Sequence, residues 1–257
     1  MANSRTEQPE ARYFESFDGA RIAWREIGEG RPVVLIHGYF SNATVNWVRY
    51  GHADAVAAEG YRIIMPDLRG HGDSAKPHDP ASYPPDALMR DNIALIEHLG
   101  LTDYDLGGYS LGARTTVRML AAGGVTPTRV VLGGMGLTGI VATEGRGGYF
   151  RKVLTNLGSF ERGSREWLTE AFLKTTDGDP EALLRVLDTF VDTPRDALDA
   201  IAQPVLVVAG VEDDDNGSAP ELADALPGGT YSEVPGNHMS AVTKPELGQA
   251  IAAFLAR

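Results

Sequence analysis

The sequence predicts an α/β protein with a mostly parallel sheet and helices on both faces of that sheet. Short apolar runs alternate with helical stretches along most of the 257 residues, which is typical of βαβ units. The run at 32–36, Pro-Val-Val-Leu-Ile, contains no polar residue, as expected of a strand buried on both faces. Ligands bind such sheets at the carboxyl ends of the strands, so functional residues are expected directly after strands.

The first half of the chain is expected to begin with an antiparallel pair, because Asp18-Gly19 is a strong hairpin signal between two extended runs. Gly60 and Gly100 each follow a helical stretch and are interpreted as helix stops. The expected strands are 13–17, 21–25, 32–36, 61–65, 104–107 and 129–132. The expected helices are 47–59, 86–99 and 111–122.

The alternation stops near residue 134 and resumes at residue 204. Asp179-Pro180 and Thr193-Pro194 each combine a capping side chain with a proline in the first helical turn. The helices expected in this stretch are 149–157, 165–174, 180–190 and 196–201. We therefore predict a helical cap at 134–203, inserted in a core of 1–133 and 204–257. The later core elements are strands 204–209 and 230–234 and helices 220–226 and 245–256.

The stretch Gly108-Tyr109-Ser110-Leu111-Gly112 has the pattern G-x-S-x-G and joins a strand to a helix. At such a joint the pattern is typical of a nucleophile elbow, in which the serine has a strained backbone. The two glycines let strand and helix approach closely, and the helix N-terminus favours negative charge near the serine hydroxyl. Ser110 is the candidate nucleophile. The alternative is a strand–turn–helix joint with an incidental serine.

A serine hydroxyl needs a base, and histidine suits this role. Of six histidines, His238 lies in a turn-rich loop after the last expected strand, from which it can reach back over the sheet edge. A carboxylate must then orient the imidazole. The loop after strand 204–209 holds four acidic residues at 212–215. We choose Asp213, with Asp214 as the alternative, and expect two of the four to be solvated loop charges.

Three other residues that follow strands are assigned structural roles. His37 and His71 are expected to make buried hydrogen bonds. Asp67 precedes the elbow, and we expect it to order its own loop through Arg69 or backbone N–H groups.

The order Ser110, Asp213, His238 is that of α/β hydrolases, and the sequence resembles this superfamily over nearly its whole length. The matching motifs are His37-Gly38, Asp-Leu-Arg-Gly-His-Gly-Asp-Ser at 67–74, the elbow, Gly210-x-x-Asp213 and Gly-Asn-His at 236–238. The resemblance implies an eight-stranded sheet and a cap that governs substrate choice. It also implies an oxyanion hole formed by the backbone N–H groups of Tyr39 and Leu111.

Within this superfamily, a serine at the elbow argues against the dehalogenase and epoxide-hydrolase branches, which use aspartate. Tyr-Phe-Ser follows His37-Gly38, unlike the His-Gly-Gly-Gly of lipases or the His-Gly-Gly-Pro-Gly of proline aminopeptidases. We predict a small soluble carboxylesterase that forms an acyl-enzyme and needs no metal or cofactor. Its pocket is expected between sheet edge and cap, lined by Tyr39, Phe40, Tyr109, Met135, Phe150, Trp167, Phe172 and Met239.

Other activities remain open on the same residues. A lactonase or a carbon–carbon-bond hydrolase can use the same triad. A hydroxynitrile lyase can also use it, and a cap lysine near the serine, Lys152 or Lys174, would support that activity. A ligand-binding receptor on the hydrolase fold is the remaining alternative.

Composition restricts the partners. The formal net charge of −12 argues against nucleic acid or an anionic membrane as a partner. The absence of cysteine excludes disulfides, thiol nucleophiles and Cys-ligated zinc and fits a cytoplasmic location. Residues 1–10 are polar, unlike a signal peptide, and no apolar run approaches the roughly 18 residues of a membrane span. We expect a small-molecule ester as ligand and a monomer or homodimer.

Overall fold

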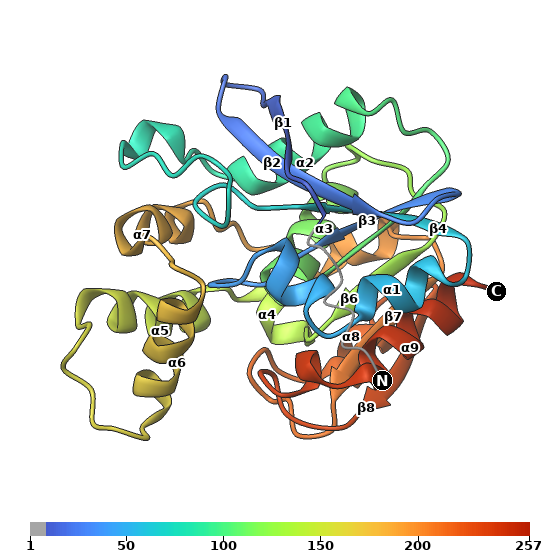
Figure 1. The fold of residues 1–257 in the computed structure, drawn as a ribbon. Helices are drawn as coiled ribbons and strands as arrows, with labels where there is room; N and C mark the ends of the chain where they lie inside the picture. Colours follow the sequence, from blue (N-terminus) through green and yellow to red (C-terminus); the bar gives the residue numbers. More distant parts are fainter. Residues whose placement is uncertain (1–8) are drawn as a thin grey trace, which may run out of the picture.

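The computed structural model describes residues 9–257 (Figure 1). Residues 1–8, on which most of the signal-peptide prediction falls, lie outside this range. An eight-stranded sheet with the order β1-β2-β4-β3-β5-β6-β7-β8 forms the centre of the molecule. The strands are β1 (Arg12–Glu15), β2 (Arg21–Ile27), β3 (Arg31–Ile36), β4 (Tyr61–Pro66), β5 (Asp105–Tyr109), β6 (Val130–Gly133), β7 (Val205–Gly210) and β8 (Gly229–Val234).

Strand β2 pairs antiparallel with both β1 and β4, and all other pairs are parallel. The predicted α/β-hydrolase fold with a mostly parallel, eight-stranded sheet is thus confirmed, including the antiparallel start. The helices are α1 (His52–Ala57), α2 (Ala87–His98), α3 (Leu111–Ala121), α4 (Leu137–Val141), α5 (Glu144–Thr155), α6 (Arg165–Thr175), α7 (Pro180–Asp188), α8 (Ala219–Asp224) and α9 (Pro245–Leu255).

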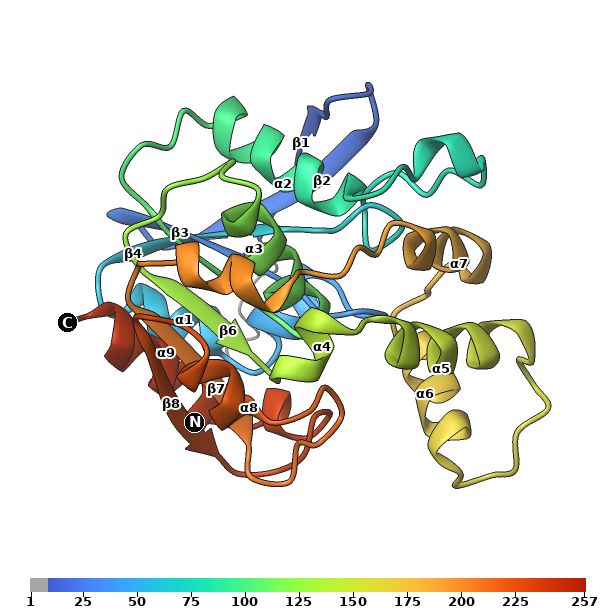
Figure 2. The ribbon, with the colours of Figure 1, turned by 180° about the vertical axis from the view of Figure 1, so that it is seen from behind.

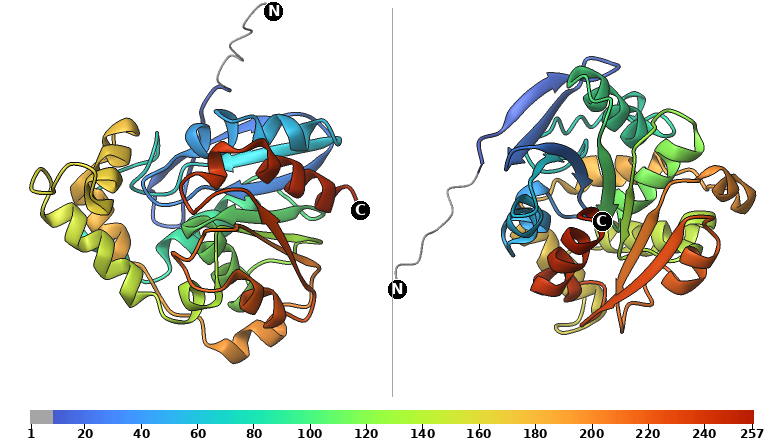
Figure 3. Two further views of the ribbon diagram at one scale, coloured as in Figure 1. Left: turned by 90° about the horizontal axis from the view of Figure 1, so that it is seen from below. Right: turned by 90° about the vertical axis from the view of Figure 1, so that its right-hand side faces the viewer.

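Strand β3 explains why an unbroken apolar run is needed at the centre of the sheet. Val33 and Leu35 pack in one core cluster with residues of α1 and α9, which lie side by side on one face (Figure 3). Val34 and Ile36 point the opposite way, into the cluster that includes residues of α2, α3 and α8. All four side chains are fully buried, because successive residues of a strand face opposite sides of the sheet.

Between β6 and β7 the chain is helical and turns away from the sheet. Helices α5, α6 and α7 project to one side of the molecule (Figures 1 and 2), and we call this segment, residues 144–188, the cap. Helix α4 and the 3₁₀ helix Arg195–Ala200 instead contact α3. The predicted division at 134–203 therefore remains a proposal, and both ends of that range lie against the core.

Two predicted helices differ from the structure. The stretch 47–59 is not one helix. A single π-type turn at Thr44–Val48 is separated from α1 by Gly51, whose φ of +77° ends the first turn. Helix α5 begins five residues before the expected 149–157, because three glycines at 145, 147 and 148 weaken the helical pattern there.

Candidate active site

Ser110 lies at the turn between β5 and α3, with φ 54° and ψ −113°. This strained conformation, predicted from G-x-S-x-G, exposes the hydroxyl at the sheet edge. Both glycines are required by close contacts. A Cβ at Gly112 would lie 2.0 Å from the carbonyl oxygen of Ile36, and one at Gly108 would lie 2.4 Å from the carbonyl carbon of Gly112. The crossing of β3, β5 and α3 is therefore as tight as main chains allow.

The structure brings Ser110, His238 and Asp213 into one hydrogen-bonded chain. His238 Nε2 lies 3.0 Å from Ser110 Oγ, and His238 Nδ1 lies 2.9 Å from Asp213 Oδ2. The His238 and Asp213 side chains are only 8% and 3% exposed. In a neutral imidazole with its proton on Nδ1, Nε2 is free to accept the serine proton. Asp214, the sequence alternative to Asp213, is exposed.

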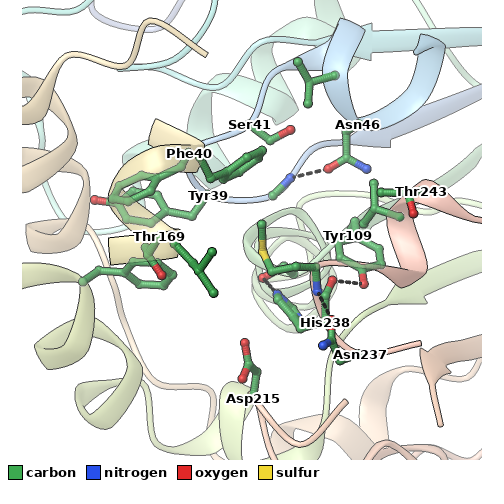
Figure 4. Close-up of a pocket in the computed structure, with 18 of the residues that line it drawn as sticks. Tyr39, Phe40, Ser41, Asn46, Tyr109, Thr169, Asp215, Asn237, His238 and Thr243 are labelled. Carbon is green, nitrogen blue, oxygen red and sulfur yellow. Dashed lines mark hydrogen bonds between the residues drawn. The ribbon is translucent and has the colours of Figure 1, made fainter. Parts of the chain in front are cut away.

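Hydrogen bonds fix the main chain at His238 and at the two residues that follow it. The Tyr109 hydroxyl donates to the His238 carbonyl oxygen at 2.8 Å (Figure 4). In the same loop, Asn237 Oδ1 accepts from the backbone N–H groups of Met239 and Ser240. Tyr109 precedes Ser110, so one strand end carries the candidate nucleophile and also supports the candidate base.

The predicted oxyanion turn packs directly against the elbow. A Cβ on Gly38 would lie 3.4 Å from Ser110 Cβ, and the Gly38 N–H donates to Asn46 Oδ1 at 2.9 Å (Figure 4). Within residues 9–257, the N–H groups of Tyr39 and Leu111 donate to no acceptor. Two unpaired donors thus flank the serine, the arrangement that an oxyanion requires.

His37 and His71 lie beneath this turn. The Leu68 N–H donates to His37 Nε2 at 2.9 Å, and the two imidazole rings are 5.1 Å apart. Burial lowers the pKa of His37 and holds the pKa of His71 well below its usual value. Both side chains are therefore neutral structural groups at physiological pH, in line with the roles predicted for them.

Asp67 orders its loop through backbone N–H groups, which is one of the two ways that the sequence predicts. It accepts from the N–H groups of Ala43 at 2.8 Å and Asp73 at 2.9 Å, and it pairs with Arg25. The other predicted route, through Arg69, is wrong. Arg69 is fully buried and pairs with Asp18 and Asp91 instead, because its side chain points away from Asp67 toward α2 and the β1–β2 turn.

A cavity of about 630 Å³ opens over Ser110, between the loops at the sheet edge and the cap (Figure 4). Its walls come from the oxyanion turn, the loops after β7 and β8, and helices α5 and α6. The lining residues are Gly38, Tyr39, Phe40, Ser41, Val45, Asn46, Tyr50, Tyr109, Ser110, Arg146, Phe150, Arg165, Leu168, Thr169, Phe172, Glu212, Asp214, Asp215, Asn237, His238, Met239, Val242 and Thr243.

Phe40, Tyr109 and Met239, which the sequence analysis named as pocket residues, line this cavity, as do Phe150 and Phe172. Met135 and Trp167 do not, and their prediction is wrong.

Met135 is 1% exposed, and its sulfur lies against Gly139 of α4 inside the core. On α6 the lining residues are Arg165, Leu168, Thr169 and Phe172, which share one helical face. Trp167 is on another face, where the Arg162 guanidinium lies 5.9 Å from its ring.

An ionic cluster that the sequence does not predict lies in the cavity wall. Asp215, one of the four acidic loop residues, pairs with Arg146 of α5 and Arg165 of α6. Its side chain is only 14% exposed, so it is not a solvated loop charge. The pattern at 212–215 signals an acidic loop, but the sequence contains no sign of which cap side chains reach it.

The two cap lysines pair with glutamates away from the serine. Lys152 Nζ lies 2.8 Å from Glu166, and Lys174 pairs with Glu170. Neither lysine is among the residues that line the cavity. Neither lysine thus gives the support for a hydroxynitrile lyase that a cap lysine near Ser110 would give.

The sequence profile of the family described as "alpha/beta hydrolase fold" matches residues 31–130, which include β3, β4, the elbow and α3. The chain belongs to the α/β-hydrolase superfamily. An esterase from Exiguobacterium antarcticum has the same fold, with a TM-score of 0.78 at 21% identity over 96% of this chain and 100% of that chain.

Two curated relatives carry different names. The chain is 30% identical, in an alignment of 215 positions that covers 76% of its length, to the "dihydrolipoyllysine-residue acetyltransferase component of acetoin cleaving system" of Pseudomonas putida. It is 33% identical over 99 residues, or 38% of its length, to "epoxide hydrolase 2" of Siraitia grosvenorii. The matched parts span only 56% and 30% of these relatives. Membership of the α/β-hydrolase superfamily thus establishes the fold, and the reaction must be inferred from the residues of the site.

Across residues 9–257, no group of three or more histidine or acidic side chains is arranged to hold a metal ion. In the same part of the chain, no helix combines the length and the apolar character that crossing a membrane requires.

Proposed function

We propose that this α/β hydrolase cleaves carboxylic esters of small molecules through an acyl-enzyme. The observation that supports the proposal most directly is the hydrogen-bonded chain from Ser110 through His238 to Asp213. It ends beside two unpaired backbone N–H groups at the elbow and the oxyanion turn. Nucleophile, base, orienting acid and oxyanion donors are the parts that acyl transfer needs.

In the proposed reaction, His238 Nε2 takes the proton of Ser110 Oγ as that oxygen attacks the ester carbonyl. The N–H groups of Tyr39 and Leu111 stabilise the oxyanion, with each such donor contributing about 3–4 kcal/mol. The alcohol leaves with the proton from His238. Water then attacks the acyl-enzyme and gives its proton to His238, and the carboxylic acid is released as Ser110 regains its proton. Asp213 stays ionised throughout and stabilises the imidazolium.

The cavity supports a small, largely apolar substrate. Its volume of about 630 Å³ lies within the range of small-molecule sites, roughly 300–1,000 Å³. Aromatic side chains from the sheet edge and from the cap form much of the wall, with Phe40 from the oxyanion turn and Phe150 and Phe172 from the cap. An elbow serine, in place of the aspartate expected for an epoxide hydrolase, favours acyl transfer. We also propose that the enzyme is cytoplasmic, that it acts as a monomer or homodimer, and that it needs no cofactor.

The test is hydrolysis of p-nitrophenyl esters of increasing acyl length by the wild type and by Ser110→Ala. We expect serine-dependent turnover with an initial burst, because deacylation follows acylation in a separate step. The variant is expected to lose roughly 10⁴-fold or more of kcat. Equal turnover by the two proteins would contradict the proposal. Activity on lactones with none on any linear ester would keep the triad and change the substrate class.

A further inference from the structure

The loop between β7 and α8 joins the cap to the candidate catalytic acid. Asp215 Oδ2 accepts a hydrogen bond from Arg146 Nη2 at 2.6 Å, and Asp215 Oδ1 pairs with the Arg165 guanidinium. These two arginines come from different cap helices, α5 and α6. The side chains of Asp215 and Arg146 are each only 14% exposed, so their ion pair is largely shielded from water.

The same residue contacts the acid through its main chain. The Asp215 N–H donates to Asp213 Oδ1 at 3.3 Å, and that oxygen lies 3.1 Å from His238 Nδ1. The side chain of Asp215 thus binds the cap while its backbone binds the carboxylate that orients His238. A shift of the Asp215 main chain removes one of the hydrogen bonds that fix this carboxylate.

The neighbours of Asp215 leave the loop little freedom. Asn216 Nδ2 donates to the Gly134 carbonyl oxygen at 3.0 Å, and its own carbonyl accepts from the Gly139 N–H at 2.8 Å. On the other side, the Glu212 N–H donates to the Gly236 carbonyl at 3.1 Å, two residues before His238. A rigid, short loop of this kind transmits a displacement instead of absorbing it.

The cap has no second ionic attachment on this side. In the part of the chain that the structure describes, Asp215 is the one residue outside the helical segment 143–190 that hydrogen-bonds or ion-pairs with α5 or α6. Helix α7 is attached elsewhere, where the Tyr39 hydroxyl donates to the Leu183 carbonyl oxygen at 2.6 Å. Apolar contacts, such as those of Phe150 with Tyr39 and Phe40, also hold α5 against the core, and Asp215 supplies the polar attachment of α5 and α6 beside the loop that carries Asp213.

We propose that Asp215 is a positioning residue that couples the seating of the cap to the orientation of Asp213, and through it of His238. The coupling deepens the proposed function, because its consequence for rate rests on the Ser110–His238–Asp213 chain. Removing the Asp215 charge leaves the shielded Arg146 guanidinium without a counter-ion, which is strongly unfavourable. Helices α5 and α6 then move toward water, and the loop loses the two contacts that fix it against the cap.

The decisive variant is Asp215→Asn, because it keeps the backbone N–H that reaches Asp213 and removes the charge that holds the arginines. Its matched control is Asp188→Asn, which breaks an ion pair between α5 and α7 inside the cap, Arg151 to Asp188 at 2.8 Å. Arg165→Gln is a milder second variant. Because the Arg165 side chain is 61% exposed, this variant is expected to fold even if Asp215→Asn does not.

The first readout is the rate at which a fluorophosphonate probe labels Ser110, which reports the activated serine without a chosen ester. We expect Asp215→Asn to label roughly 3- to 30-fold more slowly than the wild type, Arg165→Gln to be slowed less, and Asp188→Asn to match the wild type. In Asp215→Asn, the further change Arg146→Gln is expected to recover part of the lost labelling rate, because it removes the shielded guanidinium that was left without a counter-ion.

The second readout is backbone hydrogen–deuterium exchange, followed in residues 144–175 and 211–217 of the intact protein. Asp215→Asn is expected to raise exchange in both segments, and Asp188→Asn in the cap alone. The coupling would be overturned if Asp215→Asn and Arg165→Gln were both labelled at the wild-type rate and showed unchanged exchange at 211–217. A wild-type protein that is never labelled would instead refute the proposed function, while the exchange data would still decide whether cap and loop are coupled.

Discussion

The sheet edge that carries Ser110 and the cap that covers it are stabilised by different kinds of contact. At the edge, main chains touch main chains: Gly112 has no room for a Cβ against Ile36, and the hydroxyl of the buried Tyr109 supports His238. Within the cap, half-exposed side chains pair across helices, as in Arg151 with Asp188. Exposed ion pairs stabilise little, about 0–1 kcal/mol. Changes at the edge are thus expected to affect the chemistry, and changes in the cap away from the Asp215 pairs the choice of substrate.

The largest difference is expected between two adjacent acidic residues. Asp213→Asn should lower kcat by about 10⁴-fold, because the amide favours the wrong imidazole tautomer. Asp214→Asn should leave kcat close to the wild-type value, since Asp214 is exposed and bonds to neither histidine nor serine. Steady-state kinetics of both variants on one ester measures the contrast. The opposite ranking would assign the acid to Asp214.

A smaller effect at the same edge is expected for Tyr109→Phe. The change removes one hydroxyl and leaves the buried His238 carbonyl without its donor, at a cost of about 1–3 kcal/mol. If that cost falls on the orientation of His238, kcat drops roughly 10- to 100-fold while KM changes little. Thermal unfolding distinguishes this result from a loss of fold. An unchanged kcat with reduced stability would make Tyr109 a purely structural residue.

For cap side chains that line the cavity without pairing with Asp215, we expect a change of specificity instead of a loss of rate. Phe172→Ala enlarges the cavity and should shift the preferred acyl chain to greater length, altering the ratio of kcat/KM for long and short esters roughly tenfold. Trp167→Ala is the matched control, because Trp167 lies on the same helix outside the cavity. A shift with Trp167→Ala as large as that with Phe172→Ala would mean that the cap acts as a whole and not through its inner face.

The last expected effect is on stability. His37 and His71 are buried, and burial lowers the pKa of each in the folded protein. Below about pH 6.5 the unfolded chain binds protons that the folded chain does not. The free energy of unfolding therefore falls as the pH drops from about 6.5 toward the lower folded pKa values, by at most about 1.4 kcal/mol per pH unit for each histidine. Above that window the contribution is fully present.

Urea unfolding at pH 7.5 and pH 5.5 measures this loss. The His71→Asn variant should lose less stability over the same interval than the wild type, because one titrating group is gone. Equal losses in the two proteins would show that His71 is already protonated in the folded state at pH 5.5.

The same comparison explains what the sequence could and could not predict. The sequence predicts that Ser110, Asp213 and His238 meet, because each follows a strand and the carboxyl ends of parallel strands lie at one edge. Tyr39 and Leu111 contribute backbone groups, whose position depends on the turn and not on the side chain. The geometry of these five positions matches the prediction, and their catalytic roles await the kinetic tests.

Cap residues follow no such rule. Trp167 lies outside the cavity because the lining face of α6 is set by how that helix packs, which a helical period does not reveal. Met135 fails for a related reason: a methionine after a strand fits the core as well as the site. The Asp215 cluster went unpredicted because it joins residues 50 and 69 positions apart in the chain, with no local pattern to connect them.

The bond from the Tyr39 hydroxyl to the Leu183 carbonyl oxygen has a consequence for how this scaffold can diversify. Its acceptor belongs to the main chain of α7, so any residue at position 183 preserves it except one that distorts the helix. The cap can exchange most of its side chains, and with them its ligand, without losing its attachment beside the oxyanion turn. Directed evolution of new specificities is thus best started on the inner face of α6, with Tyr39 left unchanged.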